Sequence, residues 1–196
     1  MIDDFRPALE GLTFTTERLL LRPLRDEDAA PLAELADQPQ VAAGTLNLPL
    51  PYTPHHAETF IQIERESRAK GAFASSALTR RADQRFIGMM GLHFQWDHRR
   101  AEIGYWLGVP FWNQGYATEA ARALLAFAFR DASLNRVFAT HFSDNPASGR
   151  VMQKLGMTYE GVLRQHYFRF GQPKDAVCYG ILRSEWEAQQ TGAPHI

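Results

Sequence analysis

One stretch of the sequence constrains the fold more than any other: an apolar run that meets an amphipathic run across a single glycine. Residues 101–109 read AEIGYWLGV, which predicts a strand, and residues 117–130 read ATEAARALLAFAFR, which predicts a helix. Gly115 lies at the junction among small or uncharged neighbours. Such a glycine either permits a left-handed turn or clears space for phosphate oxygens at the helix N-terminus.

Further strands and helices are predicted on both sides of this unit. Strands are expected at 18–24, 72–79, 85–95, 136–142, 157–169 and 174–183, and helices at 28–38, 54–70, 115–130 and 145–156. Asp28, Thr53 and Asn145 are the expected N-caps of three of these helices. Consecutive strands favour antiparallel hairpins, whereas strands that alternate with helices favour parallel pairing. We therefore expect an α/β chain with a mixed sheet flanked by helices.

Composition limits the class of protein. The 196 residues, 45% of them hydrophobic, suffice for one domain over 1–196 with a substantial core. A formal net charge of −1 favours neither nucleic acid nor a membrane surface as a partner. Cys178 is the single cysteine, which excludes an intrachain disulfide, and the scattered histidines predict no metal site. Residues 1–10 lack the apolar core of a signal peptide and no long apolar run is present, so we expect a cytoplasmic protein.

The kind of ligand follows from what surrounds Gly115. The dinucleotide fingerprint G-x-G-x-x-G and the P-loop pattern are both absent. Pro110 cannot donate to a strand ladder, so regular pairing should fail near Val109 and leave backbone groups for an extended ligand that carries amides. A ligand with a diphosphate at one end and amides along its arm satisfies both features. Coenzyme A is such a ligand.

Separated motifs resemble the GNAT superfamily of N-acetyltransferases, and within it the RimJ/RimL-type branch: AEIGYWL, WNQGYATEA, NPASGRVMQKLGM and EGVLRQ. The resemblance extends over roughly residues 16–186. It implies the GNAT fold, in which a mixed, mostly antiparallel sheet of six to seven strands is flanked by about four helices. It also implies an acetyltransferase with acetyl-CoA as cosubstrate and no metal.

The resemblance assigns the acetyl-CoA contacts mainly to backbone groups. The diphosphate would be bound by the amides of Gln114, Gly115, Tyr116 and Ala117. Main-chain groups of Leu107 and Val109 would hold the pantetheine arm, and the Asn145 side chain would meet one of its amides. Trp112 departs from the family pattern Q/R-x-x-G-x-G/A, a change that a site built on backbone tolerates.

The proton donor to the departing thiolate is less plain from the sequence. Many superfamily members place a tyrosine at the position of Met152, which cannot donate a proton. The resemblance makes Ser148 the substitute, although a serine in a first helical turn also caps backbone. Tyr159, His166 and Tyr167 are further candidates, and each is equally compatible with a half-buried strand position. The departure at Met152 also leaves open a non-catalytic acyl-CoA-binding module.

Glu102 is the candidate base. Strand alternation places it on one face with Gly104, Trp106 and Gly108, where the glycines leave room for a substrate. The alternative is a solvated charge at a strand end. A weak base suits a protein N-terminal α-amine, whose pKa of about 8 leaves roughly a tenth neutral at pH 7.

The acceptor amine is only broadly constrained. The loop 44–56 and the hairpin tip FGQPKD lie where the family places acceptor contacts, and neither carries the charge that a polyamine or a phosphate would need. We expect direct attack by a peptide N-terminus on acetyl-CoA in a ternary complex. The alternative acceptor is a small-molecule amine. An exposed sheet edge could also pair two copies into a homodimer.

Overall fold

The computed structural model describes residues 6–192, so the first five and last four residues lie outside it. The strands are β1 (Phe14–Thr15), β2 (Leu19–Arg22), β3 (Phe73–Arg80), β4 (Phe86–Gln95), β5 (Arg100–Leu107), β6 (Arg136–Phe142), β7 (Thr158–Arg169) and β8 (Gln172–Leu182). The helices are α1 (Ala29–Ala36), α2 (Pro39–Ala43), α3 (Pro54–Ala69), α4 (Tyr116–Arg130), α5 (Pro146–Lys154) and α6 (Arg183–Thr191). The predicted mixed α/β arrangement is confirmed, with β1, α2 and α6 added to it.

The strands form one eight-stranded sheet in the order β1-β2-β3-β4-β5-β6-β8-β7. Every neighbouring pair is antiparallel except β5 and β6, which are parallel. That parallel pairing spans only Arg100–Glu102 and its partners Arg136–Phe138. Beyond these residues the two strands have no ladder between them, and we call the space from Ile103 and Ala139 onward the β5–β6 gap.

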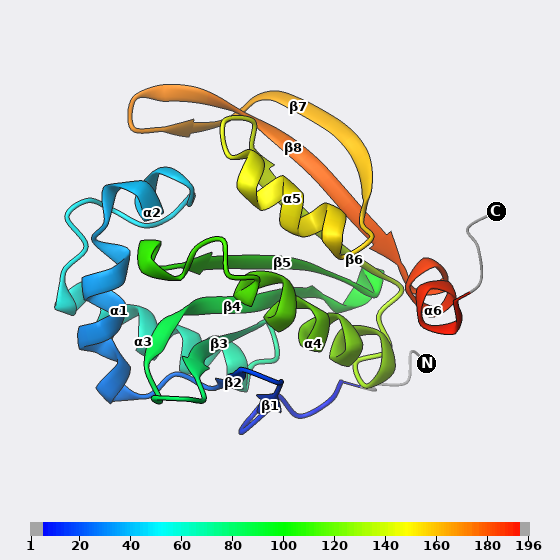
Figure 1. The fold of residues 1–196 in the computed structure, drawn as a ribbon, viewed down its shortest axis with the longest axis horizontal. Helices are drawn as coiled ribbons and strands as arrows, with labels where there is room; N and C mark the ends of the chain where they lie inside the picture. The colour runs from blue at the N-terminus through cyan, green and yellow to red at the C-terminus, as the bar shows by residue number, and fades with distance from the viewer. Residues whose placement is uncertain (1–5, 193–196) are drawn as a thin grey trace.

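Helices cover both faces of the sheet. Figure 1 shows α4 and α5 in front of the strands and α3 behind them, with the β7–β8 hairpin arching over α5. The predicted apolar stripe of α4 is confirmed, because its residues are buried against the sheet: Ala117, Ala121, Leu124, Leu125 and Ala128. On the other face α1 packs against α3 and β4, and α3 packs against β3.

Two of the three predicted caps are confirmed, and the third has a different role. Thr53 accepts a hydrogen bond from His56 N, and Asn145 accepts one from Ser148 N. Asp28 precedes α1 but makes no cap bond to it. Its buried carboxylate instead accepts two hydrogen bonds from Arg22 and one from the backbone of Arg25, which fixes the turn before α1 to β2.

The elements that the sequence did not indicate are short or poorly patterned. β1 has two residues and α2 has five, too few to show a period. Strand β8 starts at Gln172, two residues before the expected position, because Phe170 and Gly171 both have positive φ and make a two-residue hairpin turn. α6 is held by Trp186, whose ring lies 5.4 Å from that of Phe129 on α4.

Candidate active site

The β5–β6 gap is lined by backbone that has lost its ladder. Gly108 N donates to Ile87 O on β4, and backbone direction alternates along a strand. The N–H and C=O groups of Ile103, Tyr105 and Leu107 therefore point away from β4 and toward the gap. Pro110 follows at once in a 3-10 turn, η3 (Val109–Phe111), so the predicted end of regular pairing near Val109 is confirmed.

The two main-chain groups predicted to hold the pantetheine arm are already hydrogen-bonded to side chains of the protein. Val109 N donates to Gln38 Oε1 at 3.0 Å, and Leu107 O accepts from the Trp112 indole at 2.7 Å. The second bond explains the departure at Trp112, whose ring fastens the η3 turn to the end of β5. Leu107 O retains a second lone pair, whereas Val109 N would need Gln38 to move before it could bind a ligand.

Gly115 has the left-handed backbone of a turn and also an open approach to the start of α4. Its φ of 82° and ψ of 0° are left-handed, so the turn requires a residue without a side-chain penalty. A Cβ at this position would meet only Arg18 Nη2, at 3.4 Å, so the approach is nearly open. No side chain caps α4. The first intrahelical bond is from Glu119 N to Gly115 O, which leaves the N–H groups of Tyr116, Ala117 and Thr118 without intrahelical partners.

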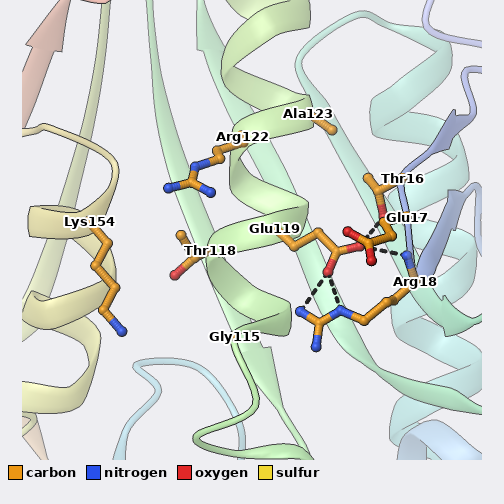
Figure 2. Close-up of a pocket in the computed structure, with 9 residues that line it drawn as sticks. All are labelled: Thr16, Glu17, Arg18, Gly115, Thr118, Glu119, Arg122, Ala123 and Lys154. Atoms are coloured by element: carbon orange, nitrogen blue, oxygen red, sulfur yellow. Dashed lines mark hydrogen bonds and ion pairs between the residues drawn. The ribbon is translucent and has the colours of Figure 1, made fainter. Parts of the chain in front are cut away.

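Cationic side chains surround this helix end. Figure 2 shows Arg122 and Thr118 of α4 and Lys154 of α5 pointing into the space between the two helices, beside Gly115. They line an open pocket of about 650 Å³. On the other side Arg18 is paired with Glu119, donates to Gln114 O at 2.9 Å and lies over the Tyr116 ring. Glu17 and Glu119 also line the pocket, and Glu119 is paired with Arg18. The groups that favour an anion there are therefore the start of α4, Arg122 and Lys154.

Glu102 lies where the β5–β6 ladder ends. Its carboxylate accepts a hydrogen bond from Thr140 Oγ1 of β6 at 3.3 Å, and that hydroxyl lies 3.4 Å from Tyr167 Oη of β7. Burial raises the pKa of Glu102, and the bond from Thr140 partly opposes that rise. A carboxylate with a raised pKa is a stronger base than an ordinary one.

Only one of the two glycines near Glu102 leaves space for a substrate. A Cβ on Gly104 would meet nothing within 4 Å, whereas a Cβ on Gly108 would lie 2.8 Å from the Leu35 side chain of α1. Gly108 is therefore required for packing, and the expectation of room beside Glu102 applies to Gly104 alone.

Ser148 approaches the gap from the opposite face of the sheet. Its Oγ lies 2.8 Å from Tyr105 Oη, and its carbonyl oxygen is a second acceptor within reach of that hydroxyl, at 3.1 Å. Since Tyr105 and Glu102 are an odd number of residues apart on β5, they point to opposite faces. The Ser148 side chain does not cap α5, because Asn145 Oδ1 holds the Ser148 amide. Asn145 Nδ2 has no hydrogen-bond partner among residues 6–192.

The remaining candidates separate clearly. Met152 is 1% exposed and belongs to the core. Tyr159 is 56% exposed and packs edge-on against Tyr179. The His166 ring lies edge-on to the Tyr167 ring, and Tyr167 is the candidate whose hydroxyl lies beside the Thr140 partner of Glu102.

Comparison with known proteins decides the family. Residues 18–158 match the family model described as an acetyltransferase (GNAT) domain. The chain belongs to the GNAT family. It is 33% identical over 172 residues to the uncharacterized N-acetyltransferase YoaA of Bacillus subtilis, covering 86% of this chain and 95% of that protein. It is 32% identical over 180 residues to the B. subtilis protein named "Putative ribosomal N-acetyltransferase YdaF", covering 89% and 96%.

Solved structures give the same result for the fold. A GNAT-family acetyltransferase from Bacillus anthracis superposes with a TM-score of 0.79 at 25% identity, covering 88% of this chain and 99% of that one. Mycobacterium smegmatis RimJ, solved in complex with CoA-disulfide, superposes with a TM-score of 0.82 at 22% identity, covering 94% of this chain and 96% of that one. The family match and the curated relatives make this GNAT protein an acetyltransferase, and the solved structures show the same fold.

The sequence did not indicate two residues that contact the candidate catalytic side chains, Tyr105 and Thr140. Both lie in strands whose patterns look structural, and only the tertiary contacts to Ser148 and Glu102 single them out. Within the described range no three histidine, cysteine or acidic side chains gather as metal ligands. No helix described here has the length and apolarity of a membrane span.

Proposed function

We propose that this acetyltransferase transfers the acetyl group of acetyl-CoA to a protein N-terminal α-amine, or to a similar amine of low pKa, by direct attack in a ternary complex. The observation that carries the proposal is the β5–β6 gap itself. It has an uncapped helix N-terminus beside one end and the carboxylate of Glu102 at the other. A ligand with a diphosphate and a reactive thioester can contact both ends at once.

We assign the acetyl-CoA site to backbone and side-chain groups that have no hydrogen-bond partner or can form a further hydrogen bond. The diphosphate takes the free amides at the start of α4, which include those of Tyr116 and Ala117, and Gly115 admits it because no side chain blocks the approach. The pantetheine arm lies along β5 and reaches the Asn145 amide nitrogen. The RimJ structure with CoA-disulfide supports this choice of ligand through its common fold.

The acceptor is assigned from the Glu102 carboxylate at the gap and from one relative. Glu102 takes the proton of the amine, directly or through water, while Gly104 leaves the space in which that amine lies. An α-amine of pKa about 8 requires far less help from a base than lysine at about 10.4. The relative YdaF, which carries a ribosomal N-acetyltransferase name, supports a protein N-terminus as acceptor.

The test is an acetyl-CoA-dependent assay over N-terminal peptides, polyamines, amino acids and aminoglycosides, followed by pH–rate profiles on the best substrate. Glu102→Gln should depress kcat/KM at neutral pH, and the deficit should shrink as pH rises because the neutral amine then forms without a base. For an α-amine the recovery should occur near about pH 8, and for lysine or a polyamine at about pH 9–10.

The pH at which the wild-type rate falls on the acid side follows from the pKa of Glu102. Burial raises it, so the wild-type rate should fall on the acid side at a pH above the usual range of a glutamate. Glu58→Gln on the exposed face of α3 is the matched control and should leave the profile unchanged. Parallel profiles of Glu102→Gln and wild type would contradict a base role. Turnover of polyamines alone would contradict the α-amine.

A further inference from the structure

A part-buried hydrogen bond between Tyr105 of β5 and Ser148 of α5 bears on how the leaving thiolate is stabilised. The position where related enzymes carry a tyrosine is Met152, which is buried in the core. A different tyrosine hydroxyl, from Tyr105, lies 2.8 Å from Ser148 Oγ on the same helix. The fold thus brings a phenol to α5 from the sheet.

We propose that Tyr105 is a positioning residue that donates its hydroxyl hydrogen to Ser148 Oγ and so leaves the Ser148 hydrogen free for the departing thiolate of CoA. The inference rests on the proposed function. Tyr105 Oη has one hydrogen and two acceptors within reach, Ser148 Oγ at 2.8 Å and Ser148 O at 3.1 Å. When Tyr105 donates to Ser148 Oγ, the hydroxyl hydrogen of Ser148 takes no part in that bond and is available to another acceptor.

The surroundings of Tyr105 favour this donor role. Burial raises the pKa of Tyr105 to about 12, against a smaller opposing effect of the Ser148 bond, so the phenol stays protonated at any working pH. A phenolate would accept the serine hydrogen instead and withdraw it from the gap. A hydroxyl that accepts one hydrogen bond also becomes a better donor in the next.

The step balances without a proton leaving Tyr105. The amine nitrogen forms the new C–N bond and gives up one proton, which Glu102 takes. The C–S bond breaks, and its electron pair goes to sulfur. The thiolate so formed accepts a hydrogen bond from Ser148 Oγ and is protonated later by solvent. Tyr105 and Ser148 keep their hydrogens throughout.

A merely structural role for Tyr105 would consist of holding α5 on the sheet. The chain offers a matched control, because Tyr179 Oη of β8 also bonds this helix, accepting from Gln153 Nε2 at 3.1 Å. Tyr105→Phe and Tyr179→Phe each remove one hydroxyl that contacts α5. Only the first touches Ser148.

The experiment compares kcat and the KM for acetyl-CoA across wild type, Tyr105→Phe, Tyr179→Phe, Ser148→Ala and the Tyr105→Phe/Ser148→Ala double variant, with folding checked by circular dichroism. Ser148→Ala should lower kcat by about 10²-fold, the usual loss of a donor to developing charge. Tyr105→Phe should lower kcat by about tenfold with KM unchanged. The double variant should be no slower than Ser148→Ala, because Tyr105 acts through Ser148.

Three results would overturn the inference: full kcat in Tyr105→Phe, an equal loss in Tyr179→Phe, or additive losses in the double variant. Each requires a wild-type enzyme that turns over. A wild type that acetylates no amine contradicts the proposed function, which is a separate and distinguishable failure.

Discussion

Gly115 has two structural features that the sequence could not separate. Its backbone is left-handed, and its missing side chain leaves the start of α4 open beside Arg18. Most L-residues placed there would be strained, so loss of function in a bulky variant would not by itself show a phosphate site. Asn and Asp are the exceptions, since both tolerate left-handed backbone. The two differ in charge and scarcely in size.

We therefore predict that Gly115→Asn and Gly115→Asp distinguish a role in the turn from a role in binding the diphosphate. Both variants should fold, as checked by circular dichroism and urea unfolding. Gly115→Asn should weaken acetyl-CoA binding modestly, whereas Gly115→Asp should weaken it by a further tenfold or more, about 1.4 kcal/mol, because a carboxylate would face the diphosphate. Isothermal calorimetry measures both affinities. Equal affinities would mean that charge at this position does not matter and that Gly115 serves only the turn.

The β7–β8 hairpin is tied by hydrogen bonds to α2 and the loop after it. Arg169, near its tip, donates to the carbonyls of Thr45 at 3.0 Å, Ala42 at 3.4 Å and Leu48, all in or just after α2. The expectation that the loop 44–56 and the hairpin tip serve one site thus gains a physical link. One guanidinium holds together two segments more than a hundred residues apart.

We predict that Arg169→Met raises the KM for the acceptor about tenfold, equivalent to about 1.4 kcal/mol, while the affinity for acetyl-CoA stays the same. The reason is that the loop after α2 loses its hydrogen-bond donor and becomes less ordered where the acceptor enters. Arg164→Met, an exposed arginine of the same strand, is the control and should match wild type. Steady-state kinetics with each substrate varied provides the measurement. A change in the KM for acetyl-CoA alone would contradict this prediction and would place Arg169 on the cofactor side of the site.

At the scale of the whole molecule, the β5–β6 gap interrupts the middle of the eight-stranded sheet. The strands on either side of the β5–β6 gap share only three residue pairs, from Arg100 to Glu102. Helices α4 and α5 cover that junction (Figure 1). A ligand in the gap would contact β5, α4 and α5 together and would oppose the separation of the two parts.

We predict that acetyl-CoA raises the melting temperature of the protein. At a hundredfold excess over Kd the stabilisation is about 2.7 kcal/mol, which corresponds to roughly 5–10 °C for a chain of this size. Acetylated pantetheine without the diphosphate, at the same concentration, is the control and should shift the melting temperature less. Differential scanning fluorimetry measures both. Equal shifts in melting temperature would show that the diphosphate adds nothing to binding, which would contradict a diphosphate site at the N-terminus of α4.

The sequence determined the order of the elements and the βα unit around Gly115. Periodicity and caps are local, so the long helices, the hairpins and the end of β5 at Pro110 could be predicted from neighbouring residues. The short α2 and β1 could not, because their formation depends on partners elsewhere in the chain. The resemblance of its motifs also identified the family, since those motifs shape one local backbone.

Only the tertiary structure decided which polar groups meet across the gap. Tyr105 meets Ser148 although 43 positions separate them, and Thr140 meets Glu102 across 38. Nothing in the local pattern of a strand tells whether a tyrosine will face a helix or solvent. Gly104 and Gly108 look alike in sequence, yet one opens into space and the other is filled by Leu35 of α1. Side-chain contacts across the sheet depend on register and packing, and these are properties of the folded chain alone.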